Sequence, residues 1–319
     1  MKLLSYRRKR IPSIGALIGS SVLDLREAAK YKVGGAFTDL SMNGVSDMIS
    51  FLRLGENGLV EARKAIEYVA KQVGLEPGFK NLISLEEIDV EAPIPYPKKN
   101  IVCLGLNYAD HVAEGDKTLD EEQSIPEHPI FFTKAPTAIN GPYDNIIYPR
   151  VTERLDYEVE LALVIGKEGK YIAEEEAYDH IAGYSVFNDV SARDLQTRHG
   201  QWYKGKSIDT FAPMGPYLVT PDEVGDPMDL DITLSVNGVI RQDSNTSHLI
   251  FNIPKILSIL SAGITLEVGD IIATGTPSGV GSAHKLGLLK IGDLVEARIE
   301  RIGSLRNRVV SETNLERLD

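Results

Sequence analysis

Short apolar runs and amphipathic stretches alternate in the N-terminal part of the chain. The apolar runs within residues 1–24 are typical of short strands. Two helices are predicted after them. Ser46 is placed to cap the segment SDMISFLRLG, and apolar residues then recur at helical spacing up to Val73, just before Gly74. The pattern predicts a small α/β domain over residues 1–92.

A proline-rich segment, EAPIPYPKKN, follows at residues 91–100 and carries prolines at positions 93, 95 and 97. Each proline fixes its own φ and biases the preceding residue away from the helical region. Prolines at alternate positions therefore predict a stiff, extended segment. We expect the boundary between two domains here, with the second domain over residues 93–319.

From Asn100 onward the pattern is dominated by β-strands. IVCLG is typical of a buried strand, and apolar residues alternate from position 230 up to Asn237-Gly238, a two-residue hairpin signal. GDIIATG and GDLVEARIERI predict further strands, and Ser191 and Asp194 are spaced to open a short helix as a capping box. Because strands do not alternate regularly with long helices, Rossmann and TIM-barrel folds are disfavoured. The sequence predicts an α+β fold that is mainly β.

Composition and charge narrow the range of partners. The chain has 319 residues, 43% apolar and 25% charged, which is an ordinary globular composition. The 46 acidic residues outnumber the 34 lysines and arginines, so the formal net charge is −12. Nucleic acids normally select a basic face, and we therefore expect no nucleic-acid partner. A single cysteine, Cys103, excludes intrachain disulfides and Cys-rich zinc sites.

Membrane and secretion signals are not supported by the sequence. No apolar run approaches the ~18 to 20 residues that a membrane helix requires. The segment YRRKR followed by IPSIGALIGSSVL resembles a secretion signal, but Pro12 breaks its apolar part, and Asp24 and Arg26 follow without a cleavage site. We expect a cytoplasmic protein that does not bind membranes.

Three acidic residues alternate along the segment LDYEVELALVIG at residues 155–166. Asp156, Glu158 and Glu160 would point to one face of a strand. A half-buried strand with a solvated acidic face explains the pattern as well. However, three like charges spaced two residues apart repel one another unless a cation lies among them. A fourth acid, Asp189, ends the apolar run YSVFND, either as a helix-entry residue or as a strand-end ligand. If Glu158, Glu160 and Asp189 converge, their all-oxygen site favours Mg²⁺, Mn²⁺ or Ca²⁺.

The segment LGLNYADHVAEGDK at residues 104–117 contains a histidine–glutamate pair. Asn107 can cap a helix, on which His111 and Glu114 are spaced i, i+3. A carboxylate on one imidazole nitrogen fixes the tautomer and leaves the other nitrogen free as a general base. A surface His–Glu pair without catalytic function is the alternative, and the proximity of a metal site favours the catalytic interpretation.

A polar, glycine-interrupted segment at residues 191–216 is either a solvated loop or a mobile lid that brings cations to an anionic substrate. Its polar side chains include Arg193, Gln196, Arg198, His199, Lys204 and Lys206. We expect residues 196–206 of this segment and residues 107–122 to order over an anionic ligand. In the empty enzyme we expect them to be loose, with His111 too far from the metal to act.

The segment ATGTPSGVGSAHK at residues 273–285 satisfies neither phosphate-binding pattern. Val280 stands where a P-loop needs its second glycine, and His284 where G-x-G-x-x-G needs its third. A nucleotide site is therefore not supported. The loop can still offer backbone N–H groups and the Thr276 hydroxyl to a carboxylate or enolate oxygen.

Six segments between residues 98 and 305 together resemble the fumarylacetoacetate hydrolase superfamily, most nearly its acylpyruvase and oxaloacetate decarboxylase branch. They are VCLGLNYADHVAE, IFFTKAPTAI, LDYEVELALVIG, NDVSARDLQ, GKSIDTFAPMGP and GDIIATGTPSGVG. The resemblance implies a mixed β-sandwich roll of the fumarylacetoacetate hydrolase type, usually a homodimer, with a Mg²⁺ or Mn²⁺ site.

The resemblance also assigns expected roles to residues. The metal carboxylates would be Glu158, Glu160 and Asp189, and the base and its orienting acid His111 and Glu114. Lys206, as a catalytic residue, and Arg193, Gln196 and Thr276, as substrate-binding residues, match positions that line the pocket. One position departs from the pattern: Leu106 stands where a basic residue precedes Asn-Tyr in members of this family. A cation that could meet the far end of a substrate is therefore absent at position 106.

These observations predict a Mg²⁺- or Mn²⁺-dependent enzyme that cleaves C–C bonds of small anionic 2-oxo or 2,4-dioxo acids through a metal-stabilised enolate. Acylpyruvate hydrolysis and oxaloacetate decarboxylation both fit. A 2-hydroxymuconate-type isomerase or decarboxylase remains an alternative, because all of these reactions need the same enolate. The alternative from another class is a non-enzymatic, metal-stabilised scaffold, against which His111, Glu114 and Lys206 argue, because a scaffold needs none of them.

Overall fold

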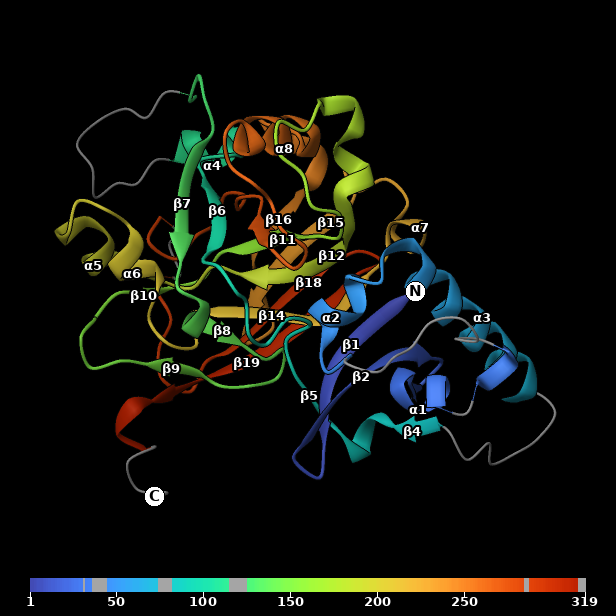
Figure 1. Ribbon diagram of the computed structural model, residues 1–319. Coiled ribbons are helices and arrows are strands. Elements are labelled where there is room, and N and C mark those ends of the chain that lie inside the picture. Colours follow the sequence, from blue (N-terminus) through green and yellow to red (C-terminus); the bar gives the residue numbers. More distant parts are fainter. Residues whose placement is uncertain (31, 36–44, 74–81, 115–124, 284–286, 315–319) are drawn as a thin grey trace.

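The computed structural model describes residues 1–30, 32–35, 45–73, 82–114, 125–283 and 287–314. Within these residues the protein is mainly β, with helices at the periphery (Figure 1). No helix in the described part of the chain is long and apolar enough to cross a membrane. Gly74, His284 and residues 115–122, on which parts of the sequence predictions rest, lie outside the described residues.

A large sheet extends across the molecule and is antiparallel except where β17 pairs with β6 and β14 with β8. Its strands run in the spatial order β4 (Leu82–Ser84), β3 (Ser21–Asp24), β2 (Ile11–Ile18), β1 (Lys2–Arg8), β14 (Ala212–Val219), β12 (Ile181–Asn188), β11 (Val159–Ile165), β17 (Ile271–Ala273), β6 (Ile101–Gly105) and β7 (Ile130–Lys134). Two short strands are added at its sides, β5 (Asp89–Val90) on β1 and β8 (Ile139–Asn140) on β14.

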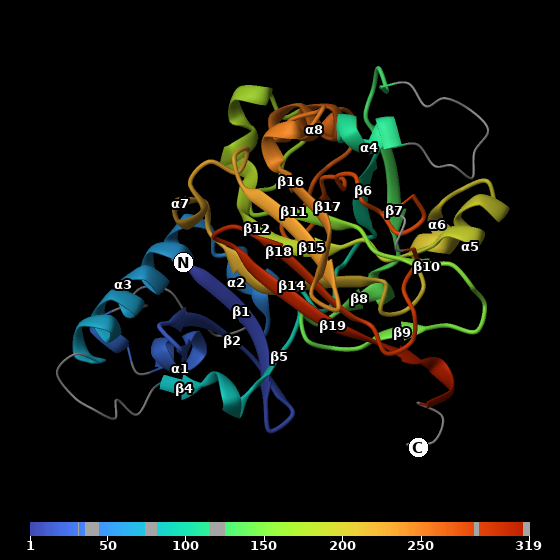
Figure 2. The same cartoon turned by 180° about the vertical axis from the view of Figure 1, so that it is seen from behind.

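A second sheet packs behind the first and is seen best from the opposite side (Figure 2). It contains β16 (Val239–Asn245), β15 (Asp231–Val236), β18 (Leu294–Ile299), β19 (Gly303–Ser311) and β9 (Ile146–Tyr148) in that order. The predicted hairpin is confirmed, since Asn237 and Gly238 join β15 to β16 with φ values of 52° and 78°. A two-stranded sheet, β10 (Leu155–Asp156) with β13 (Ser191–Ala192), lies at the site described below.

The helices lie at the periphery of the molecule (Figure 1). They are α1 (Leu25–Lys30), α2 (Met48–Leu52), α3 (Gly55–Val73), α4 (Ala109–Glu114), α5 (Arg193–Arg198), α6 (Tyr203–Lys206), α7 (Pro221–Val224) and α8 (Ile253–Ser261). Short 3₁₀ segments lie at Val33–Gly35, Leu85–Glu87, Pro136–Ala138, Glu174–His180, Thr246–His248 and Glu312–Asn314.

The capping residues of two predicted helices differ from those expected. Asp47, not Ser46, caps α2, in a capping box completed by Ser50. The capping box expected of Ser191 and Asp194 is wrong, because α5 begins at Arg193 without a side-chain cap. The reason is that Asp194 accepts a hydrogen bond from Thr152, a residue distant in sequence, and Ser191 belongs to strand β13.

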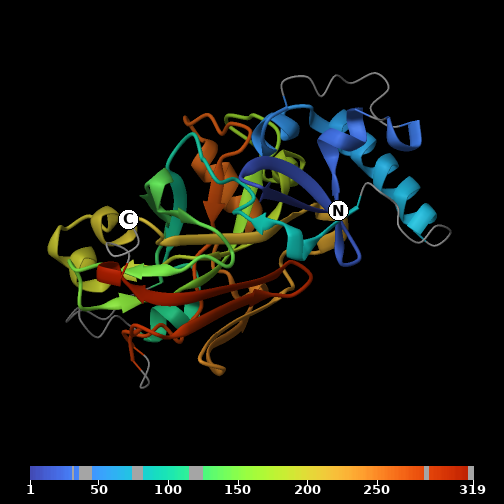
Figure 3. The ribbon, with the colours of Figure 1, turned by 90° about the horizontal axis from the view of Figure 1, so that it is seen from below.

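The N-terminal part lies at one end of the molecule and shares the large sheet with the rest (Figure 3). The contact is made by β1, which pairs with β14 through Lys2–Val219 and Leu3–Leu218. One hydrophobic cluster contains buried residues from both parts, among them Leu3 and Val309. Backbone pairing and apolar packing thus join residues 1–92 to the remainder of the chain.

Candidate functional site

Three carboxylates converge at the centre of the large sheet. Glu158 and Glu160 stand on either side of the first residue of β11, and Asp189 directly follows β12, which pairs with β11. One oxygen from each carboxylate lies within 4.8 Å of the others, and all three residues are at least 96% buried. This burial excludes the interpretation of the segment as a half-buried strand with a solvated acidic face. Every residue of β11 is buried: β12 and β17 pair with its two edges, and β15 and β18 pack against it.

Two of these three carboxylates are neutralised by buried cations. Lys206 Nζ lies 2.6 Å from Oε2 of Glu158 and 2.7 Å from Oδ2 of Asp189. Arg193 Nη2 lies 2.6 Å from Oε1 of Glu158. Lys134, which is fully buried at the end of β7, donates to Oδ1 of Asp189 and to the carbonyl of Val190 at 3.0 Å. Every carboxylate oxygen of Glu158 and Asp189 thus has a cationic partner.

Glu160 has no such partner among the described residues; its Oε2 accepts a 2.8 Å hydrogen bond from the backbone N–H of Gly275. Burial raises the pKa of Glu160 well above its ordinary value, and the charges of Asp189 and Glu158 raise it further. Burial would also raise the pKa of Glu158, but Arg193 and Lys206 lower it to about 2. Of the three carboxylates, Glu160 is therefore the one whose ionised form has no cationic partner among the described residues.

Asp156, the first acid of the alternating segment, does not join the trio. Its Oδ2 accepts from Arg193 Nε at 2.8 Å, and its two oxygens accept from the backbone N–H groups of Gly281 and Ser282 at 2.7 and 3.0 Å. Arg193 therefore bridges Asp156 to Glu158. Its position was expected to bind substrate, but two of its three guanidinium nitrogens donate to protein carboxylates.

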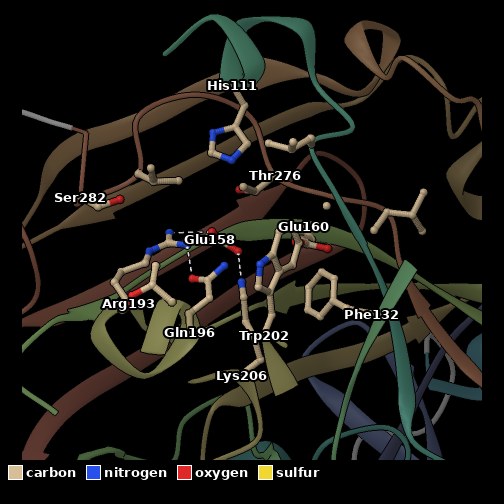
Figure 4. A pocket seen from close by; sticks show the side chains of 15 residues that line it. His111, Phe132, Glu158, Glu160, Arg193, Gln196, Trp202, Lys206, Thr276 and Ser282 are labelled. Atoms are coloured by element: carbon tan, nitrogen blue, oxygen red, sulfur yellow. Dashed lines mark hydrogen bonds and ion pairs between the residues drawn. The ribbon is translucent and has the colours of Figure 1, made fainter. Parts of the chain in front are cut away.

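A pocket opens above Glu158 and Glu160 (Figure 4). His111 of α4 lines it opposite Glu158 and Glu160, with its ring directed toward the carboxylates. Its Nδ1 lies 3.5 Å from Oε2 of Glu114 and has no hydrogen-bond partner in the described part of the chain. Both oxygens of Glu114 accept from the Gly279 N–H at 3.0 Å. The described part of residues 107–122, which ends at Glu114, thus places His111 at the pocket that Glu158 and Glu160 also line. The expected loosening of this segment in the empty enzyme stays a prediction.

The apolar side chains that line the pocket are Leu104, Leu106, Phe132, Trp202 and Val280. The Phe132 and Trp202 rings meet edge to face with their centroids 5.2 Å apart. Leu106 has a φ of 55°, which is rare for a bulky residue and occurs where the surroundings over-determine the backbone. The neighbouring Asn107 supplies that constraint through hydrogen bonds to the backbone of Phe251 and Thr274.

The structure brings the other predicted pocket residues to the same place. Gln196 lines the pocket and accepts from Arg193 Nη1 at 3.1 Å. Thr276 also lines it, but its hydroxyl donates to the carbonyl of Val159 at 2.9 Å and accepts from Gln242. The N–H groups of the loop at residues 275–282 bind Glu160, Glu114 and Asp156, not an open anion site, because these buried carboxylates need donors.

Sequence reasoning assigned no role to Lys134, Gln242 or Trp202. Lys134 ends the apolar run IFFTK, and a lysine that ends a buried strand is a signal for a buried counter-ion, since such a charge is stable only beside an opposite one. Gln242 carries no comparable signal. It closes the loop onto β11 by accepting from the Val159 N–H and donating to Thr276.

Comparison with known proteins agrees with this geometry. The model of the fumarylacetoacetate (FAA) hydrolase C-terminal family matches residues 100–310. The chain belongs to the fumarylacetoacetate hydrolase family. The superfamily resemblance expected from the six sequence segments is therefore confirmed, and so is the mainly β fold of this family.

Relatives in this family share most of the chain. Oxaloacetate tautomerase YisK of Bacillus subtilis is 46% identical over 82% of this chain and 86% of its own length. The mitochondrial oxaloacetate tautomerase FAHD2A of Bos taurus is 46% identical over 82% of this chain and 79% of its own length. These family members are named for tautomerisation, so hydrolysis or decarboxylation by this chain is not established by them.

Two solved structures of family members extend the likeness to the whole fold. A fumarylacetoacetate hydrolase from psychrophilic Exiguobacterium antarcticum has a TM-score of 0.77 and 34% identity over 98% of this chain and all of its own. Maleylpyruvate hydrolase from Sphingobium sp. SYK-6, in complex with manganese(II) and pyruvate, has a TM-score of 0.72 and 32% identity over 98% of this chain and 99% of its own.

The residues of this family member fit a divalent cation. Three carboxylates offer hard oxygen ligands within one small buried volume, as Mg²⁺ and Mn²⁺ prefer. With all four carboxyl groups ionised, Asp156 and the trio carry four negative charges against the three positive charges of Lys134, Arg193 and Lys206. A divalent cation would change this balance from −1 to +1, which suits an anionic ligand.

Proposed function

We propose that this protein is a Mg²⁺- or Mn²⁺-dependent enzyme that interconverts the keto and enol forms of small 2-oxo acids, with oxaloacetate as the first substrate to test. The position of His111 across the pocket from the buried carboxylates carries the proposal. The oxaloacetate tautomerases at 46% identity support the substrate and the reaction. The metal ligands would be Glu158, Glu160 and Asp189.

A bound divalent cation supplies Lewis-acid polarisation of the 2-oxo group. The protein's own groups then handle the proton. The imidazole of His111 takes a proton from carbon 3, and the C–H electron pair forms the double bond between carbons 2 and 3 while the carbonyl pair moves onto oxygen. The imidazolium then returns the same proton to the oxygen on carbon 2, which gives the enol and regenerates the base; the reverse transfer regenerates the ketone. Burial would lower the pKa of Lys206, but Asp189 and Glu158 raise it above its ordinary value. Lys206 therefore keeps a positive charge beside the oxygen that becomes negative.

C–C cleavage is the second candidate reaction, and the likeness to maleylpyruvate hydrolase over 98% of this chain supports it. Cleavage passes through the same enolate but also needs a water molecule or the loss of CO₂. The contact of 3.5 Å between His111 Nδ1 and Glu114 Oε2 would then orient the base toward that water. We further propose that residues 93–319 carry the whole site, that the protein is a homodimer and that it is cytoplasmic.

The enol absorbance of oxaloacetate, with parallel pyruvate analysis, tests the proposal on EDTA-treated protein and after Mg²⁺ or Mn²⁺ is restored. We expect metal-dependent loss of the enol signal without matching pyruvate formation. His111→Ala should lower kcat about 10²- to 10⁴-fold. His248→Ala is the matched control, since His248 lies outside the residues that line the pocket and contacts Ser244 at 3.1 Å. Full activity without metal, or in His111→Ala, would overturn the proposal; stoichiometric pyruvate would assign decarboxylation instead.

A further inference from the structure

One loop connects the carboxylate centre to the helix that carries His111. The loop spans residues 275–282, and two of its backbone N–H groups donate hydrogen bonds to buried carboxylates. The Gly275 N–H donates to Glu160 at 2.8 Å, and the Gly281 N–H donates to Asp156 at 2.7 Å. Asp156 in turn is paired with Arg193. This side of the loop is therefore fixed by groups that are themselves buried and charged.

On the side of the helix, the same loop holds α4 at two points. The Gly279 N–H donates to both oxygens of Glu114, and the Ser278 hydroxyl donates to Oδ2 of Asp110 at 2.9 Å. The other oxygen of Asp110 accepts from the backbone N–H of His111 at 2.8 Å. A single carboxylate thus links Ser278 to the residue proposed as the base.

Gly279 fixes the shape of the loop between these contacts. Its φ is 100°, and a Cβ at this position would lie 1.9 Å from the carbonyl oxygen of Arg241. The left-handed backbone turns the N–H toward Glu114 and leaves the adjacent Ser278 hydroxyl facing Asp110. The loop is therefore a rigid spacer between two groups of contacts.

The imidazole of His111 needs such support from outside its own helix. Its Nδ1 is buried without a hydrogen-bond partner in the described residues, and Glu114 lies 3.5 Å from it. Helix α4 has six residues, too few to be stable without tertiary contacts. The orientation of the ring therefore depends on where the helix is held.

We propose that Ser278 and Asp110 are positioning residues, whose hydrogen bond holds His111 over the carboxylate centre. The inference rests on the proposed function, because it requires His111 to act as the base. Neither residue lines the pocket, so their effect on the reaction would pass through α4. Loss of one hydrogen bond predicts a decrease of about 3- to 10-fold in kcat/KM.

A double-mutant cycle between Ser278→Ala and His111→Ala tests this, with oxaloacetate tautomerisation and Mn²⁺ affinity as readouts. Ser278→Ala should lower kcat/KM about 3- to 10-fold in the wild-type background and leave it unchanged in the His111→Ala background. The dissociation constant for Mn²⁺ should stay at the wild-type value throughout. The matched control is Ser46→Ala, which removes an equivalent exposed bond of 3.0 Å to Asp47 far from the site.

The outcomes separate the two proposals. If His111→Ala alone has wild-type activity, the proposed function fails. Two results would overturn the positioning inference while the proposed function survives, provided that His111→Ala is impaired. In the first, Ser278→Ala has no effect on activity; in the second, Ser278→Ala lowers activity by the same factor in the wild-type and His111→Ala backgrounds. Weakened Mn²⁺ binding in Ser278→Ala would also overturn it, because the loop would then act on the carboxylates and not on His111.

Discussion

The Lys206 ammonium lies 2.6 Å from Oε2 of Glu158, so this carboxylate has a positive partner within the pocket itself. Glu160, two residues further along the chain, has a backbone N–H as its partner. The two glutamates therefore differ in charge balance although both are buried and only Val159 lies between them. Because the ionised form of Glu160 has no cationic partner among the described residues, Glu160 gains most from a divalent cation.

Glu160→Gln should separate metal binding from folding. Removing the charge relieves repulsion from Asp189 and Glu158, so the metal-free variant should be at least as stable as the wild type. Added Mn²⁺ should raise the unfolding free energy of the wild type by about 2.7 kcal/mol at one hundred times its dissociation constant, and leave the variant unchanged. Thermal unfolding across a Mn²⁺ titration measures both effects. Glu174→Gln, an exposed control paired with Lys255, should respond as the wild type does. A full Mn²⁺ response in Glu160→Gln would remove Glu160 from the ligand set.

Lys134→Met should destabilise the protein far more than loss of an exposed lysine. Lys134 and Asp189 are both fully buried, and the substitution leaves a buried carboxylate with one fewer positive partner. Breaking a buried pair costs about 3 to 5 kcal/mol of unfolding free energy, measurable by urea denaturation. The double variant Lys134→Met/Asp189→Asn should recover part of the loss. Lys64→Met, which breaks an exposed pair with Glu61, should cost less than about 1 kcal/mol. Equal losses for the two lysines would contradict a buried counter-ion.

The local pattern of the sequence was enough to find the carboxylates. The spacing of acidic residues at every second position pointed to Glu158 and Glu160, and the end of an apolar run pointed to Asp189. Both signals can be recognised in the sequence because they depend only on neighbouring residues in the chain. The pattern could not show that Asp156 separates from the trio. That separation depends on Arg193 and on the N–H groups of Gly281 and Ser282, which the fold brings to Asp156 from distant segments.

The same limit explains why the contacts of Lys134 and Asp194 were not predicted from the sequence. Lys134 meets Asp189 because β7 pairs with β6, β6 with β17 and β17 with β11, an order that no local pattern specifies. Asp194 was expected to cap its own helix and instead binds Thr152. In both cases a contact between distant segments replaced a local one, which propensity alone does not anticipate.

Asp222→Asn should weaken the junction between α3 and the rest of the protein in a pH-dependent way. Hydrogen bonding from Arg63 lowers the pKa of Asp222 to about 2, against 3.8 for an ordinary aspartate. A carboxyl group whose pKa is lowered on folding stabilises the folded state at pH values above the pKa that the group has in the unfolded chain. This contribution disappears as the pH falls from about 4 towards 2. The side chain is 45% exposed, so screening reduces the loss at pH 7 to about 1 kcal/mol.

Urea denaturation of wild type and Asp222→Asn at pH 7, 5 and 3 measures this dependence. The difference in unfolding free energy should be constant between pH 7 and 5 and smaller at pH 3, and added salt should reduce it. The control is Asp229→Asn, at an exposed aspartate between α7 and β15. Its difference in unfolding free energy from the wild type should not decrease between pH 5 and pH 3. A difference that grows on acidification would contradict the sign of the pKa shift.

Leu106→Arg should change which end of a substrate the pocket prefers. Leu106 lines the pocket, as do the apolar side chains of Phe132 and Trp202, and the cations Arg193 and Lys206 are paired with carboxylates. An arginine at position 106 would offer a free cation to the second carboxylate of oxaloacetate but gain nothing with a 2,4-dioxo acid that ends in a methyl group. A charged hydrogen bond at a partly exposed position contributes about 1 kcal/mol. The ratio of kcat/KM for oxaloacetate over acetylpyruvate should therefore rise about fivefold. Leu106→Met preserves the apolar volume and should leave the ratio unchanged. If Leu106→Arg altered both substrates by the same factor, position 106 would not face the distal end of the substrate.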